Sequence, residues 1–118
     1  MIRARLLVLA LVSAALAVGC SGDAEPPAAC ADPKPAETVR IEDFAFEPDC
    51  LLASSGASIH LENVGDAPHT FTVGGTDVNV EVASGEGAES SLSGVEPGRY
   101  AVACVYHPQM TATLEVQA

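Results

Sequence analysis

Residues 58–73 read Ser-Ile-His-Leu-Glu-Asn-Val-Gly-Asp-Ala-Pro-His-Thr-Phe-Thr-Val, and apolar and polar side chains alternate on both sides of a central turn. Ile59 and Leu61 alternate with polar neighbours before the turn, and Phe71 and Val73 do so after it. A period of two sends successive side chains to opposite faces, as in a half-buried β-strand. This stretch therefore predicts two strands joined by a loop.

The same pattern continues over the rest of residues 39–118. Leu114 and Val116 alternate with Thr113 and Glu115, and no segment has a helical period. Further apolar stretches cover residues 39–46, 50–53, 78–82 and 100–105, separated by Gly-, Pro-, Asp- and Ser-rich turns. We expect one all-β domain over residues 39–118, a two-sheet antiparallel sandwich of about seven to eight strands.

The N-terminus has the order of an export signal. Two arginines precede an apolar run from Leu6 to Val18. The run is shorter than the roughly 20 apolar residues that span a bilayer. We expect residues 1–19 to be a removed signal peptide.

Ala17-Val18-Gly19-Cys20 resembles a bacterial lipobox, in which small residues precede a lipidated cysteine, although Ala17 stands where leucine is more common. Two acyl chains on Cys20 would anchor the protein stably to a membrane. The resemblance implies a membrane-anchored lipoprotein of the cell envelope or periplasm. The alternative is ordinary signal cleavage with Cys20 as an incidental thiol.

Residues 20–38 are rich in Pro, Ala and acidic side chains and predict a lipid-anchored, semi-rigid spacer. Without residues 1–19, three basic residues face 16 carboxylates, a net charge of −13. Such an acidic chain is unsuited to nucleic acid. It favours a protein partner with a basic patch, although solubility alone also explains an acidic surface. We expect a monomer.

Residues 104–110, Cys-Val-Tyr-His-Pro-Gln-Met, place Cys104, His107 and Met110 at three-residue intervals before the last predicted strand. His69 begins another strand, and the loops at one end of a sandwich bring distant parts of the chain together. Two imidazoles, one thiolate and a weak axial thioether suit copper in electron-transfer sites. Zinc is a weaker alternative, because methionine has no place in a zinc site.

This order of His, then Cys-x2-His-x2-Met, resembles the cupredoxins, most of all the amicyanin- and plastocyanin-like members. The resemblance covers about residues 39–116 and includes residues 44–48, Phe-Ala-Phe-Glu-Pro. It implies a Greek-key sandwich and one type 1 copper ion, with His69, Cys104 and His107 roughly in a plane around it and Met110 axial. It also implies that His107 presents its ring edge at the surface as the electron exit.

Two positions depart from the family pattern. Thr70 stands where these relatives usually have an asparagine that ties the two ligand loops together, and a hydroxyl has less reach for that bond. Residues 111–112 are Thr-Ala where amicyanin has a basic residue and glycine. Both changes affect contacts around the ligands, which tune the reduction potential rather than ligation.

The cysteines allow two pairings. A bridge between Cys50 and Cys104 would resemble the inter-sheet disulfide of an immunoglobulin domain, but the chain has no tryptophan to pack on it. A Cys30–Cys50 disulfide leaves Cys104 free for metal and accounts for the remaining cysteines in an oxidising compartment. We predict the second pairing.

The predicted function is a one-electron carrier at the outer face of the cytoplasmic membrane. His60 is the one histidine outside the predicted site, and the alternating pattern places it on the solvent face of its strand. The chain therefore lacks ligands for the further copper centres of an oxidase. We therefore expect no catalytic residues and no enzyme. The alternatives are an envelope copper-binding or delivery protein and a metal-free, immunoglobulin-like interaction module.

Overall fold

The structure is a computed structural model that describes residues 26–118. Ten strands and no helix make up this part of the chain. The strands are β1 Lys34–Pro35, β2 Thr38–Glu42, β3 Ala45–Glu47, β4 Cys50–Ser54, β5 Ser58–Asn63, β6 His69–Val73, β7 Asn79–Val82, β8 Gly87–Ser91, β9 Gly98–Cys104 and β10 His107–Gln117. Consequently, no helix in the described range could cross a membrane.

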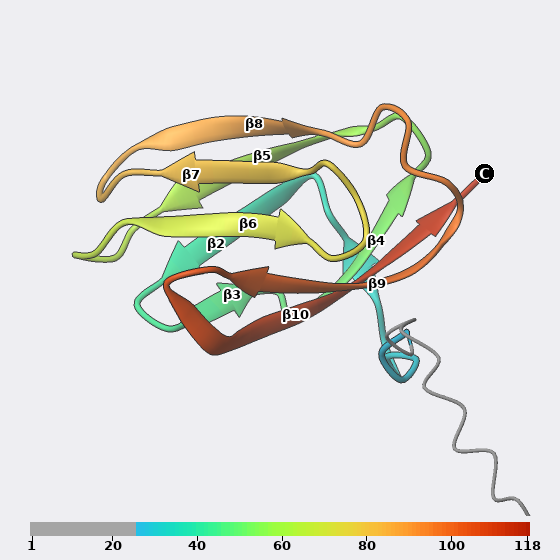
Figure 1. Cartoon of the computed structure of the whole chain (residues 1–118), viewed down its shortest axis with the longest axis horizontal. Coiled ribbons are helices and arrows are strands. Elements are labelled where there is room, and N and C mark those ends of the chain that lie inside the picture. The colour runs from blue at the N-terminus through green and yellow to red at the C-terminus, as the bar shows by residue number, and fades with distance from the viewer. Residues whose placement is uncertain (1–25) are drawn as a thin grey trace, which may run out of the picture.

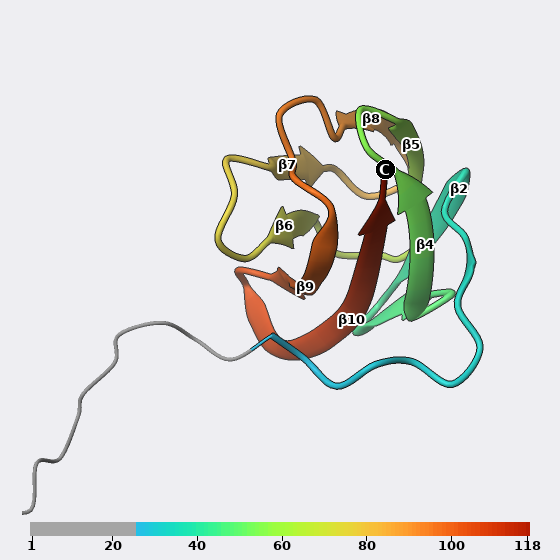
Figure 2. The same ribbon diagram turned by 90° about the vertical axis from the view of Figure 1, so that its right-hand side faces the viewer.

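The strands form two sheets that face each other (Figures 1 and 2). One sheet has six strands in the order β1-β4-β10-β9-β6-β7, and the other has four in the order β3-β2-β5-β8. The predicted all-β sandwich is confirmed. It has slightly more strands than expected, and the additional ones include the short strands β1 and β3, of two and three residues.

Both sheets are mixed rather than purely antiparallel. β4 pairs parallel with β10 and with β1, and β2 pairs parallel with β5, while the other pairs are antiparallel. The chain crosses between the sheets after β3 and again after β4, and a strand that re-enters a sheet after such a crossover can run parallel to its neighbour. Alternation in the sequence reports which side chains are buried but not the direction of the strand.

The core lies between the sheets and follows the predicted alternation. Ile59 and Leu61 are buried on β5, whereas His60 and Glu62 between and beyond them are not. The rings of Phe46 on β3 and Phe71 on β6 meet edge to face across the sandwich, 5.9 Å apart. Full burial of one such side chain contributes roughly 1.5–3 kcal/mol, so this pair is a strong link between the sheets.

The predicted disulfide is confirmed, since Cys30 is bonded to Cys50 and their Cα atoms lie 5.8 Å apart. Four residues after Cys30, β1 begins to pair with β4, and Ala36 behind it is buried. The segment expected to be a spacer therefore includes a strand of the larger sheet. The predicted signal peptide, residues 1–19, and the predicted lipidation site, Cys20, lie outside the described residues.

Candidate metal centre

Three of the four predicted ligands lie where strands of the larger sheet begin or end. β6 runs antiparallel to β9, and β9 runs antiparallel to β10. The start of β6 at His69, the end of β9 at Cys104 and the start of β10 at His107 therefore fall at one end of the sandwich, on the left in Figure 1. We call this end the ligand pole.

The side chains of these three residues converge. Cys104 Sγ lies 3.8 Å from His69 Nδ1 and 3.8 Å from His107 Nδ1. One possible ligand atom from each residue lies within 4.8 Å of those of the other two. His69 and Cys104 are fully buried and His107 is half-buried. The partial exposure of His107 agrees with its expected position at the surface.

Met110 is buried, with 1% of its surface exposed, on the first part of β10. The pairing between β9 and β10 shifts register between His107 and Thr111, so residues 108–110 are released from the regular ladder. The Met110 side chain, three residues after His107, is buried in the interior at the end of this irregular segment.

The buried thiol of Cys104 is surrounded by hydrogen-bond donors. The backbone N–H of Thr70 donates to Cys104 Sγ at 3.3 Å. Burial raises the pKa of the Cys104 thiol, but the Thr70 amide, the two histidine rings and the Tyr106 amide outweigh it and lower the pKa to about 6. The site therefore favours the thiolate, which is the form that binds a metal.

Thr70 ties the two ligand loops together. Its hydroxyl oxygen accepts a hydrogen bond from the backbone N–H of Val105 at 2.9 Å, in addition to the bond from its own amide to Cys104. The shorter side chain is sufficient because Thr70 is itself buried against the loop. The expected role of this position is thus kept although the residue type differs.

Asn63 organises the loop that leads to His69. It is 2% exposed, and its amide nitrogen donates to the carbonyls of Ala67 and Val82, both at 2.9 Å. Its side-chain oxygen accepts the N–H of Gly65 at 2.9 Å. These three bonds fix the loop from within, as an unpaired polar group at this depth would cost free energy.

The turn between β2 and β3 contributes two residues that sequence reasoning missed. Asp43 Oδ1 lies 2.9 Å from His69 Nε2. Phe44, which has a φ of 75°, sets its ring edge-on to those of His107 and His69, with centroids 4.9 Å and 6.3 Å away. In the sequence, Phe44 was marked only by its place at the start of the family-like stretch 44–48. Asp43 was not marked at all, because its charge does not distinguish it from the other acidic residues of the chain.

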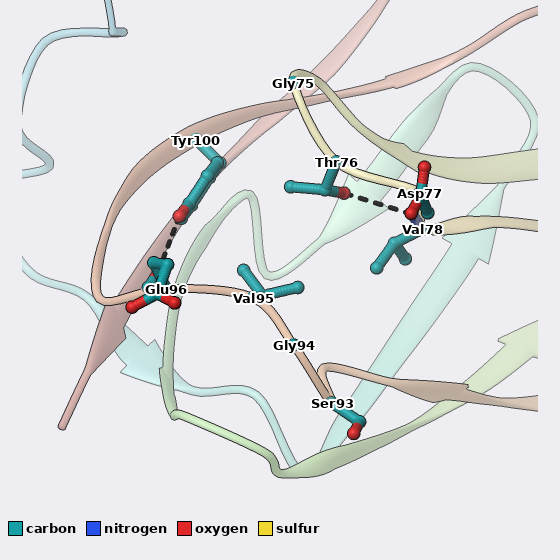
Figure 3. Close-up of a pocket in the computed structure, with 9 residues that line it drawn as sticks. All are labelled: Gly75, Thr76, Asp77, Val78, Ser93, Gly94, Val95, Glu96 and Tyr100. Carbon is teal, nitrogen blue, oxygen red and sulfur yellow. Dashed lines mark hydrogen bonds between the residues drawn. The ribbon is translucent and has the colours of Figure 1, made fainter.

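The immunoglobulin-type pairing of Cys50 with Cys104 is wrong, because Cys50 is bonded to Cys30 and Cys104 is a free, buried thiol. Elsewhere, the chain forms a hollow of about 500 Å³ at the opposite end of the sandwich, lined by residues that include Asp77, Val95 and Tyr100 (Figure 3). No histidine or cysteine lines this hollow. This hollow therefore offers no imidazole or thiol that could bind a metal.

The donor set fits copper. Thiolate and thioether favour Cu(I), and imidazole serves both Cu(I) and Cu(II). Two imidazoles and one thiolate with a nearby methionine are typical of a type 1 copper site. The hydrogen bonds that join the two ligand loops match the need of such a site for ligands that stay in place when its charge changes.

Comparison with solved structures supports the same assignment of fold. The chain is 18% identical to a purple cupredoxin from Nitrosopumilus maritimus, with a TM-score of 0.57, over 68% of this chain and 98% of the other. An oxidised amicyanin variant is 19% identical, with a TM-score of 0.57, over 70% and 82%. A copper-containing nitrite reductase from Thermus scotoductus is 22% identical, with a TM-score of 0.58, over 80% of this chain but only 25% of that enzyme.

No curated protein matches the chain. The family model described as a cupredoxin-like domain matches residues 6–116, nearly the whole sequence. This match agrees with the two-sheet sandwich and with the clustered histidines and cysteine at its ligand pole. The chain belongs to the cupredoxin-like family.

Proposed function

We propose that this protein binds one copper ion through His69, Cys104, His107 and Met110 and carries single electrons by cycling between Cu(II) and Cu(I). The observation that carries the proposal is the convergence of the two imidazoles and the thiol within 4.8 Å. The bound metal would supply the redox change. The chain supplies a fixed set of donors, a buried thiolate and a shield from water.

The ligand pole also has the surface of a docking site. The large apolar residues that are exposed in the described chain are Phe44, Val64, Val105 and Tyr106, and all four lie in loops at this pole. Phe44 contacts the half-buried His107 ring. An electron that leaves through this histidine would pass to a protein seated on the apolar loops.

Charge favours a basic partner. Two carboxylates contact residues of the ligand pole. Asp43 lies against His69, and Glu81 accepts a hydrogen bond from the Tyr106 hydroxyl at 2.7 Å. The acidic chain as a whole would speed encounter with a positively charged partner at low salt. The rate of electron transfer to such a partner is expected to fall as ionic strength rises.

The mature protein is proposed to be a monomer, tethered outside the cytoplasm by lipid on Cys20. The described N-terminal segment lies near the far end of the sandwich, where Arg99 Nη1 contacts the carbonyl of Pro27 at 3.4 Å (Figure 1). A tether that arrives there leaves the ligand pole free to meet a partner. A Cys20→Ala variant should move from the membrane fraction to the soluble fraction, and retention in the membrane would rule out this anchor.

The first test is the visible spectrum of residues 21–118 after addition of Cu(II). An intense thiolate-to-copper charge-transfer band that disappears in Cys104→Ser is the expected result. Folded, copper-treated protein without that band would reject the electron carrier. The same sample distinguishes a carrier from a copper-delivery protein, since a carrier shows a reversible redox couple with fast electron exchange and keeps its metal through the cycle.

A further inference from the structure

Asp43 connects the β2–β3 turn to the loop that carries His69. Its Oδ2 accepts the backbone N–H of Asp66 at 2.9 Å, and its Oδ1 accepts that of Ala67 at 3.2 Å. The same Oδ1 lies 2.9 Å from His69 Nε2. All three contacts suit a carboxylate, which is the ordinary form of an aspartate at neutral pH and only accepts hydrogen bonds.

A carboxylate partner determines which nitrogen of His69 is free. An ionised carboxylate only accepts hydrogen bonds, so His69 Nε2 must carry the proton in this contact. In a neutral ring the other nitrogen, Nδ1, then presents its lone pair, and Nδ1 is the atom that faces Cys104 Sγ. Nδ1 donates to the Cys104 thiolate only when both ring nitrogens carry a proton. Asp43 thus selects the tautomer in which His69 can act as a ligand.

Gly65 leaves the space that this contact needs. A Cβ atom at position 65 would lie 2.2 Å from Asp43 Oδ1 and 2.8 Å from its Cγ. The backbone of Gly65 is not in the left-handed region that marks other glycines of the chain, so its conformation does not require glycine. The absent side chain is what lets the carboxylate reach His69.

We infer that Asp43 is a positioning residue of the copper centre: it holds His69 in the ligand tautomer, places a negative charge next to this ligand, and reaches the histidine because residue 65 is glycine. This inference rests on the proposed copper function. A negative charge favours Cu(II) over Cu(I), because the oxidised ion carries one more positive charge. Asp43 therefore lowers the reduction potential, to an extent limited by solvent at its side chain, which is 31% exposed.

The alternative is that Asp43 only joins two loops through the Asp66 and Ala67 amides. Four variants separate the two roles. Asp43→Asn removes the charge and retains one oxygen acceptor, Asp43→Ala removes both, and Gly65→Ala displaces an unchanged Asp43. Asp77→Asn is the matched charge control, because Asp77 lies at the opposite end of the sandwich.

The first measurement is the midpoint potential of the copper-loaded variants, with the visible band as a check that the site has assembled. Asp43→Asn and Asp43→Ala should shift the potential upward and weaken copper binding by about 10- to 100-fold, while Asp77→Asn matches the wild type. Gly65→Ala should reproduce Asp43→Ala, and the double variant should add nothing further. A loss of unfolding stability in Asp43→Asn with no change in potential or affinity would overturn the inference.

The second measurement needs no metal. Nitrogen-15 NMR of the metal-free wild type, at a pH where the His69 ring is neutral, should find the His69 proton on Nε2, and Asp43→Ala should give a mixture of the two tautomers. A wild-type proton on Nδ1, or a tautomer unchanged in Asp43→Ala, would overturn the inference. Failure of the wild type to form the visible band would instead reject copper binding, so the two ideas fail on different results.

Discussion

The two ends of the sandwich are built differently. At the ligand pole, side-chain hydrogen bonds join residues far apart in sequence, such as Thr70 to Val105 and Asp43 to His69. In the loops that line the hollow at the opposite end (Figure 3) they are mostly local: Thr76 Oγ1 donates to the Val73 carbonyl, and the Tyr100 hydroxyl donates to the Glu96 carbonyl. The bond from Ser55 Oγ to the Val95 carbonyl is long-range, and beside these loops Arg99 makes long-range bonds to Glu115 and Pro27.

This difference separates a preorganised site from a pair of ordinary turns. Local bonds shape one loop without fixing it against another, as in the hollow of Figure 3. Long-range bonds fix the relative positions of loops, and a metal centre requires that from its ligands. Disruption of the ligand pole should therefore cost more than equivalent disruption of the opposite pole.

The largest expected effect is electrostatic. In the metal-free protein the pKa of Cys104 is about 6, below the value of about 8.5 for an unfolded thiol. Between these values the unfolded chain binds more protons, so the stability of the folded state rises with pH. The gain is on the order of 3 kcal/mol, complete above about pH 8.5 and lost as the pH falls through about 6.

Urea unfolding of the metal-free protein across this pH range measures the gain. Cys104→Ser is the control, because it removes the titrating group and keeps the fold of the loop. In Cys104→Ser the free energy of unfolding should rise much less with pH over this range. An equal rise in both proteins would show that the donors around Cys104 do not stabilise its thiolate.

The second effect compares one side chain at each pole. Asn63→Ala leaves the carbonyls of Ala67 and Val82 and the N–H of Gly65 without their partner, and the bond to Val82 is buried. We expect a loss of about 2–3 kcal/mol in the free energy of unfolding. Tyr100→Phe removes one bond from a half-buried side chain and should cost less than about 1 kcal/mol. Equal losses would contradict the difference between the poles.

Sequence patterns predicted the framework and the donors for a physical reason. Alternation on β5 and β6 reports burial directly, and the spacing of Cys104, His107 and Met110 lies within one loop. The Cys30–Cys50 pairing followed once Cys104 was assigned to the metal. These features depend on local periodicity or on the chemistry of a few rare residues.

The strand directions and the β2–β3 turn were not predictable in this way. The parallel pairing of β2 with β5 depends on how the chain crosses between the sheets. Asp43 is one carboxylate among 16 acidic residues, and only the fold brings it to His69, 26 positions later. Contacts between distant loops leave no periodic trace in a single sequence.

The third effect tests the link between the ligand loops. Thr70→Val keeps the shape of the side chain but removes the acceptor of the Val105 N–H, which is only partly buried. We expect a loss of about 1–2 kcal/mol in the metal-free protein, measured by urea unfolding. Thr70→Ser, which retains the hydroxyl, should restore most of it. If serine is no better than valine, the bond between the loops is not what stabilises this position.

The smallest effect concerns Phe44, where the ligand pole has a strained backbone. Its φ of 75° is unfavourable for any residue with a side chain, and such positions cost on the order of 1–3 kcal/mol. Its ring, although 59% exposed, gains edge-on contacts with His107 and His69 that are worth about 0.5–1.5 kcal/mol per pair. The two terms nearly offset each other.

Glycine and alanine at position 44 separate these terms. Both substitutions remove the ring, but only glycine relieves the backbone, so Phe44→Gly should be more stable than Phe44→Ala by about 1 kcal/mol in urea unfolding. Both should also uncover the His107 ring, which faster solvent exchange at that histidine would report. If alanine equals glycine in stability, the turn relaxes to an ordinary φ once the ring is gone. The contact with the two histidines would then be what holds the backbone in its strained conformation.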